Sequence, residues 1–74
     1  MKAIKIEHDS DYGQRCDTYI HNAGMVQIVK SDDPDFPEPY SVSVRAIDEN
    51  NHVVGKPIIV DLGWAIHSVE EVEV

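Results

Sequence analysis

A chain of 74 residues with 14 acidic and six basic side chains has a formal net charge of −8, so we expect one small, strongly acidic domain spanning residues 1–74. That charge argues against direct binding to DNA, RNA or an anionic membrane, because phosphate contacts need lysine and arginine. The single cysteine excludes an internal disulfide. No apolar run approaches the roughly 18 residues of a membrane span, so we expect a cytoplasmic protein.

Alternation of apolar and polar residues predicts β-strands along most of the chain. The clearest run covers residues 40–46, where Val42 and Val44 share one face and Ser43 lies on the other. Further strand-like runs cover residues 2–8, 18–21, 25–30, 52–62 and 68–74. Because the connections are too short for parallel crossovers, we expect a mainly β fold. It would be a small five-stranded antiparallel sheet, curled or partly closed into a barrel.

Two interpretations of residues 10–23 stay open. In the first, Asn22-Ala23-Gly24 forms the turn of a hairpin, with Gly24 at the position that needs a positive φ. In the second, a short helix starts after Ser10 as its N-cap and ends before Gly24, which would make the fold α+β. The β-forming residues 18–20 argue against the helix.

Ten of the fourteen acidic side chains fall into three clusters. They are Glu7, Asp9 and Asp11 in the first, Asp32, Asp33, Asp35 and Glu38 in the second, and Glu70, Glu71 and Glu73 in the third. Clustered charge of one sign on a small body produces a directional field, which steers a basic partner.

The first cluster has a spacing of two residues. If the first strand extends to Asp11, the carboxylates of Glu7, Asp9 and Asp11 project from one face about 6.5–7 Å apart, close to the separation of alternate DNA phosphates. The competing interpretation is a solvated strand end. A calcium loop starting at Asp9 lacks its bidentate glutamate, so no metal is expected.

The second cluster lies in a segment with three prolines, Pro34, Pro37 and Pro39. Prolines restrain a loop before a partner docks, which lowers the ordering cost of binding. Phe36 lies between two of them and is interpreted as a contact residue or a lid over the sheet end. Trp64 is interpreted as a core or rim residue or, if exposed, as an interface anchor. A purely solvated loop is the alternative.

Two segments share their pattern with a known family. The string Asp17-Thr18-Tyr19-Ile20-His21-Asn22-Ala23, a following strand, and Ser31-Asp32 with Pro34, Asp35, Phe36, Pro39 and Tyr40 resemble the sheet region of the phage uracil-DNA glycosylase inhibitor, over about residues 17–50. The resemblance implies an acidic DNA mimic with an antiparallel sheet and flanking helices. The early inhibitory strand of that family has no clear counterpart in residues 2–14, so the target is not implied.

The histidines and the cysteine do not predict catalysis. His8, Cys16 and His21 lack the spacing of a metal site, and a lone thiol is usually a small core residue. We therefore expect no enzyme activity, no cofactor and no metal.

These observations lead to two hypotheses. The first is a phage- or mobile-element-encoded inhibitor that mimics nucleic-acid charge and blocks the basic groove of a bacterial host enzyme, such as a repair glycosylase, a restriction enzyme or a CRISPR effector. Its partner-binding residues would be Glu7, Asp9, Asp11, Asp32, Asp33, Asp35, Phe36, Glu38 and Trp64. The alternative is a small β-barrel module that binds another protein, with its acids serving solubility. A monomer and a weak homodimer both stay open.

Overall fold

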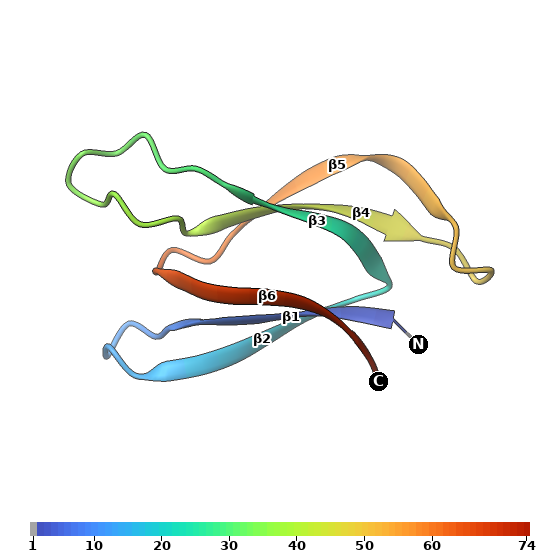
Figure 1. Ribbon diagram of the computed structural model, residues 1–74, viewed down its shortest axis with the longest axis horizontal. Coiled ribbons are helices and arrows are strands. Elements are labelled where there is room, and N and C mark those ends of the chain that lie inside the picture. Colours follow the sequence, from blue (N-terminus) through green and yellow to red (C-terminus); the bar gives the residue numbers. More distant parts are fainter. Residues whose placement is uncertain (1) are drawn as a thin grey trace.

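The computed structural model describes residues 2–74. In these residues it contains β-strands and no helix (Figure 1). The strands are β1 (Lys2–Asp9), β2 (Arg15–His21), β3 (Ala23–Val29), β4 (Ser41–Ile47), β5 (Val53–Asp61) and β6 (Ile66–Glu73). They form two three-stranded antiparallel sheets, β2-β1-β6 and β3-β4-β5, called sheet A and sheet B below. The mainly β, antiparallel prediction is confirmed, and no helix in residues 2–74 is of the length and apolarity that a membrane crossing requires.

Several details of the prediction are wrong. Six strands in two open sheets replace the five-stranded sheet or partly closed barrel. The short helix near residues 10–23 is absent, because this segment forms a turn and then β2. The flanking helices that the resemblance implies do not occur in residues 2–74 either.

The hairpin expected at Asn22-Ala23-Gly24 is also wrong, because β2 and β3 belong to different sheets. Asn22 is the point where the chain passes between them. Its N–H donates to Lys2 O at 2.9 Å in sheet A, and its C=O accepts from Ile47 N at 2.9 Å in sheet B. Its φ of 56° lies in the left-handed region that asparagine tolerates. The physical reason for the correction is that local turn chemistry cannot show which strand pairs with which.

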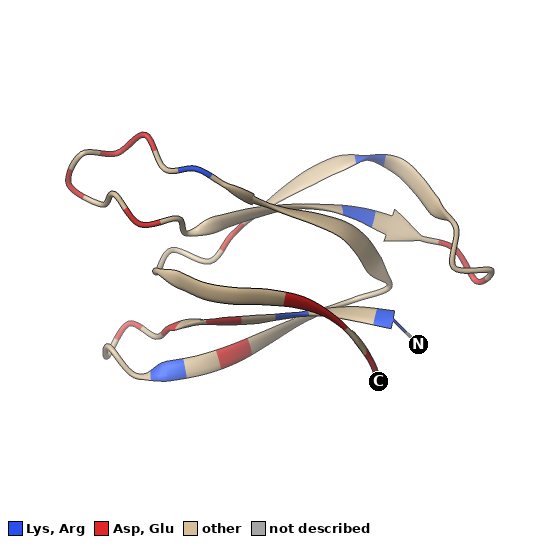
Figure 2. Ribbon diagram, viewed as in Figure 1, with Lys and Arg blue, Asp and Glu red and all other residues tan. Residues whose placement is uncertain are grey.

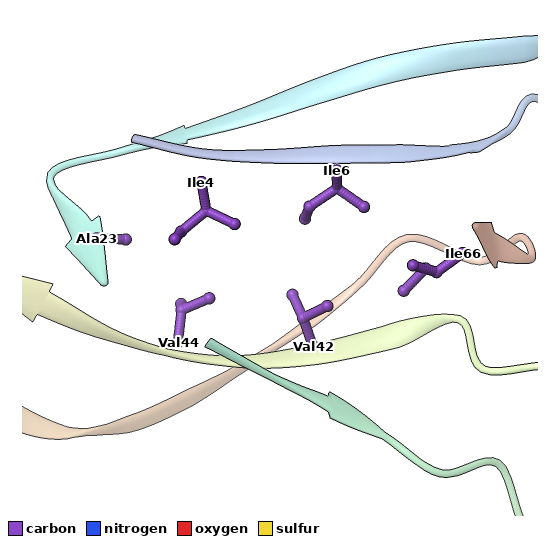
Figure 3. Packing of buried hydrophobic residues seen from close by; sticks show 6 residues of the cluster. All are labelled: Ile4, Ile6, Ala23, Val42, Val44 and Ile66. Carbon is purple, nitrogen blue, oxygen red and sulfur yellow. The ribbon is translucent and has the colours of Figure 1, made fainter. Parts of the chain in front are cut away.

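The core lies between the two sheets, as Figure 3 shows. Ile4 and Ile6 point from β1 toward Val44 and Val42 of β4, and all four are buried. Ala23 and Ile66 complete the cluster. The alternation expected along β4 is therefore confirmed at Val42 and Val44. With overall extents of 41 × 23 × 14 Å the molecule is thin, so its buried core is small.

Three connections meet at one end of the molecule. The β1–β2 turn (10–14), the β3–β4 loop (30–40) and the β5–β6 connection (62–65) all lie on the left in Figure 1. Backbone hydrogen bonds fasten them together: Asp9 N donates to Ala65 O at 3.0 Å, and Ile66 N donates to Pro39 O at 2.8 Å. We call this the loop end. The first two acidic clusters, far apart in the sequence, are thereby brought to the same end.

Candidate functional site

The first acidic cluster is partly neutralised within the protein. Glu7 and Asp9 lie on the outer face of sheet A, where Glu7 forms an ion pair with Arg15. The Asp9 carboxylate accepts a hydrogen bond from His67 Nε2 at 2.7 Å. Asp11 lies beyond the end of β1, in the exposed turn. The three carboxylates thus do not form one continuous row along a strand, because β1 ends at Asp9.

The β1–β2 turn is ordered by one serine. Ser10 Oγ accepts from the backbone N–H of Tyr12 at 3.3 Å and of Gln14 at 3.2 Å. Serine commonly stabilises turns in this way. The turn therefore shows Asp11 and the exposed Tyr12 to solvent in a defined conformation.

The second acidic cluster is different, because its carboxylates have no cationic partner. All four side chains are exposed, and none of them forms an ion pair with another residue in 2–74. They are Asp32, Asp33, Asp35 and Glu38. Figure 2 shows them as an acidic stretch around the β3–β4 loop, which extends from the loop end. Exposed charge of one sign with no internal compensation is available to an external cation.

The β3–β4 loop is held in shape by its own polar groups. Ser31 Oγ donates to Phe36 O at 2.7 Å and accepts from Asp33 N at 3.2 Å. Asp33 Oδ1 accepts from Asp35 N at 2.9 Å, and Phe36 N donates to Asp33 O at 3.1 Å. These bonds, with the three prolines, restrain the backbone that carries the four carboxylates. Ser31 is an organising residue that the sequence analysis missed. A serine two residues before an aspartate is the signal that would have indicated it.

An aromatic cluster joins this loop to the β5–β6 connection. The Phe36 ring meets Tyr40 edge to face at a centroid distance of 5.5 Å and Trp64 at 6.5 Å. Such arrangements are favoured by the ring quadrupoles. Phe36 is half-buried, whereas Trp64 keeps 41% of its surface exposed. The structure thus brings two predicted contact residues, Phe36 and Trp64, together beside the acidic loop.

The third acidic cluster lies on β6 and is engaged internally. Glu70 is 3.8 Å from Lys5 Nζ, and Glu71 Oε1 accepts from Met25 N at 3.2 Å. The N-terminal ammonium, with a smaller contribution from Lys2, lowers the pKa of Glu73. Glu70 thus links β6 to β1, and Glu71 links sheet A to sheet B, so we do not include this cluster in the candidate site.

Cys16 and His8 do lie side by side on the inner face of sheet A, with Sγ 3.6 Å from Nε2. His8 is buried, and both of its ring nitrogens already have closer partners: Nδ1 donates to Asp9 O at 2.9 Å, and Nε2 lies 2.7 Å from Thr18 Oγ1. In the neutral ring, Nε2 then accepts the Thr18 hydroxyl proton and is not free to deprotonate the thiol. Residues 2–74 contain no group of three or more His, Cys, Asp or Glu side chains that could hold a metal ion.

Comparisons with protein-family models, with curated proteins and with solved structures found no match. The resemblance to the uracil-DNA glycosylase inhibitor therefore stays a prediction.

Proposed function

We propose that this protein is a small acidic inhibitor that mimics nucleic-acid charge and occupies the basic nucleic-acid-binding groove of a host enzyme. The observation that carries the proposal is the β3–β4 loop, with four exposed carboxylates that form no ion pair in residues 2–74 and a hydrogen-bonded conformation. Carboxylates held in a fixed arrangement bind lysine and arginine without a large ordering cost.

The two parts of the loop end have different roles in this mechanism. Asp32, Asp33, Asp35 and Glu38 replace phosphates against the basic groove. Phe36 and the exposed edge of Trp64 add apolar contact beside them. Charge sets the association rate, whereas the buried apolar contact sets the lifetime of the complex. Glu7 and Asp9, being paired with Arg15 and His67, contribute mainly to the long-range field.

One observation favours the alternative function, a β-module that binds a protein through apolar contacts. Strand β5 exposes Val54, Ile58 and Ile59 to solvent. A partner that binds there would be insensitive to salt and to competing DNA, which separates the two functions in one experiment.

The test compares two variants of equal net charge as immobilised baits in a nuclease-treated bacterial lysate. Asp32→Lys with Asp35→Lys changes two loop carboxylates whose side chains form no hydrogen bond or ion pair with another residue in 2–74. Asp17→Lys with Glu49→Lys is the control, and both variants have a net charge of −4, from −8 plus two changes of +2. Asp33 is left intact because its carboxylate accepts from Asp35 N.

We expect the wild type and the control to retain one basic nucleic-acid enzyme, released by salt and displaced by DNA, and the loop variant to lose it. Uracil-DNA glycosylase is the first purified enzyme to assay for inhibition. Equal loss of the bound enzyme in both variants would contradict the proposal, and so would a partner that neither salt nor DNA releases.

A further inference from the structure

Strand β5 is an edge strand with apolar side chains exposed on both of its faces. It pairs only with β4 among the described strands. Ile58 lies opposite Val44 and therefore on the inner face of sheet B, yet 57% of its surface is exposed. Ile59 lies opposite Ser43 on the outer face and is 59% exposed. A continuous apolar run such as residues 57–60 is typical of a strand that is covered on both sides.

The outer edge of β5 also carries free backbone groups at defined positions. Leu62 N donates to Tyr40 O at 2.8 Å, so Leu62, Val60 and Ile58 direct their backbone groups toward β4. The intervening residues Ile59 and Asp61 direct theirs toward the open edge. Pro57 also faces the open edge, because it lies two residues before Ile59. Its missing N–H therefore costs sheet B no hydrogen bond, and its carbonyl remains available as an acceptor.

The charge of β5 indicates what kind of partner can bind at its edge. In a molecule of net charge −8, β5 contains one lysine, Lys56, and one acid, Asp61, and is therefore neutral. A basic partner is drawn to the acidic loop, whereas a second acidic copy meets no net charge along this edge. In an antiparallel arrangement the two copies of β5 run in opposite directions. Figure 2 shows the acidic β3–β4 loop at one end of the molecule, so the loops of the two copies then lie on opposite sides of the two-fold axis.

We propose that two copies of this chain associate by antiparallel pairing of their β5 edges about a two-fold axis at Ile59, which joins the two B sheets into one six-stranded sheet. Ile59 lies opposite Ile59 of the second copy, and the two exchange backbone hydrogen bonds. Ile58 lies opposite Val60 of the second copy, and Asp61 N donates to the Pro57 carbonyl. Every cross-strand pair at the centre is then apolar.

Neighbouring registers fit less well. An axis at Val60 sets Ile59 opposite the charged Asp61, and an axis at Asp61 sets two carboxylates against each other. An axis at Pro57 would set two prolines opposite each other, and neither has a backbone N–H to donate. The bulge at Gly55, whose carbonyl accepts from Arg45 Nε at 3.0 Å, ends the regular edge on the other side. Pairing is therefore confined to about five residues per copy, a short interface that corresponds to a weak dimer.

Sedimentation equilibrium of the full chain tests the proposal with Ile59→Lys and, as the matched control, Ile28→Lys. Ile28 is 49% exposed on β3, at the opposite edge of sheet B. We expect a reversible dimer for the wild type and the control, more populated at about 0.5 M than at about 0.05 M salt, because salt screens the repulsion between acidic copies. Ile59→Lys should raise the dimer dissociation constant by at least about tenfold, although it makes each copy less negative.

A second variant produces a gain and so does not depend on a loss of folding. In a Cys16→Ser background, Ile59→Cys places the only thiol opposite itself, within the Cα separation that a disulfide bridges. It should form a covalent dimer in oxidised glutathione much faster than Ile58→Cys, whose thiol would lie opposite Val60. A wild type that is monomeric at both salt concentrations would overturn the proposal. Equal cross-linking of the two cysteine variants would overturn the register.

Discussion

The first and second acidic clusters lie at the same end of the molecule and consist of the same residue types, but their surroundings differ. Glu7 and Asp9 stand on a strand face where Arg15 and His67 pair with them. The carboxylates of the β3–β4 loop have no such partner in residues 2–74 and are ordered by Ser31 and the prolines instead. The comparison teaches that clustered acids are available to an external cation only where the fold leaves their charge uncompensated.

The largest predicted effect is a loss of stability when the ring that holds the β3–β4 loop in place is removed. Phe36→Ala removes the edge-to-face contacts with Tyr40 and Trp64, and we expect the free energy of unfolding to fall by about 2 kcal/mol, since the ring is half-buried. Urea denaturation measures the loss. Tyr12→Ala, which removes a ring that is 89% exposed, should change stability by no more than about 0.5 kcal/mol. Similar losses in both variants would show that Phe36 does not anchor the loop.

A smaller effect, on binding affinity, should follow from loosening the β3–β4 loop without changing its charge. Ser31→Ala deletes the hydroxyl that bonds Phe36 O and Asp33 N, at a cost of about 1 kcal/mol. We expect affinity for the enzyme recovered from the lysate to fall roughly five- to tenfold, measured by surface plasmon resonance. Ser10→Ala loosens the β1–β2 turn in the same way and is the control. If both serines prove equally important, the loop end binds as a whole rather than through the β3–β4 loop.

The smallest effect should come from releasing the paired cluster. Arg15→Gln frees Glu7 from its ion pair, and the pair is solvent-exposed enough that stability should fall by only about 0.5 kcal/mol. The rate constant for association with the enzyme recovered from the lysate should rise a few-fold at low salt and return to the wild-type value at high salt. Stopped-flow mixing measures it. Arg45→Gln makes the same charge change where the guanidinium bonds the Gly55 carbonyl, so no carboxylate is released. An equal rise in both variants would mean that net charge alone sets the rate.

Local patterns in the sequence determined the strand content and the position of the acidic loop. The period of two along residues 40–46 correctly placed Val42 and Val44 in the core, because it depends only on the pleat of one strand. The three prolines of residues 34–39 correctly indicated a loop between two strands, and the acids on it are exposed. Both conclusions rest on interactions within a few residues of the chain.

Only the tertiary structure decided how these pieces combine. Asn22 carries the chain from one sheet to the other through hydrogen bonds to residues 20 and 25 positions away, Lys2 and Ile47. The pairing of Asp9 with His67, the contact of Phe36 with Trp64, and the uncovered edge at Ile59 likewise join or separate parts of the chain that are distant in sequence. Strand propensity is a local property. Sheet partition, charge compensation and edge exposure depend on which distant segments pack together, and that is decided by burial of the small core between the two sheets.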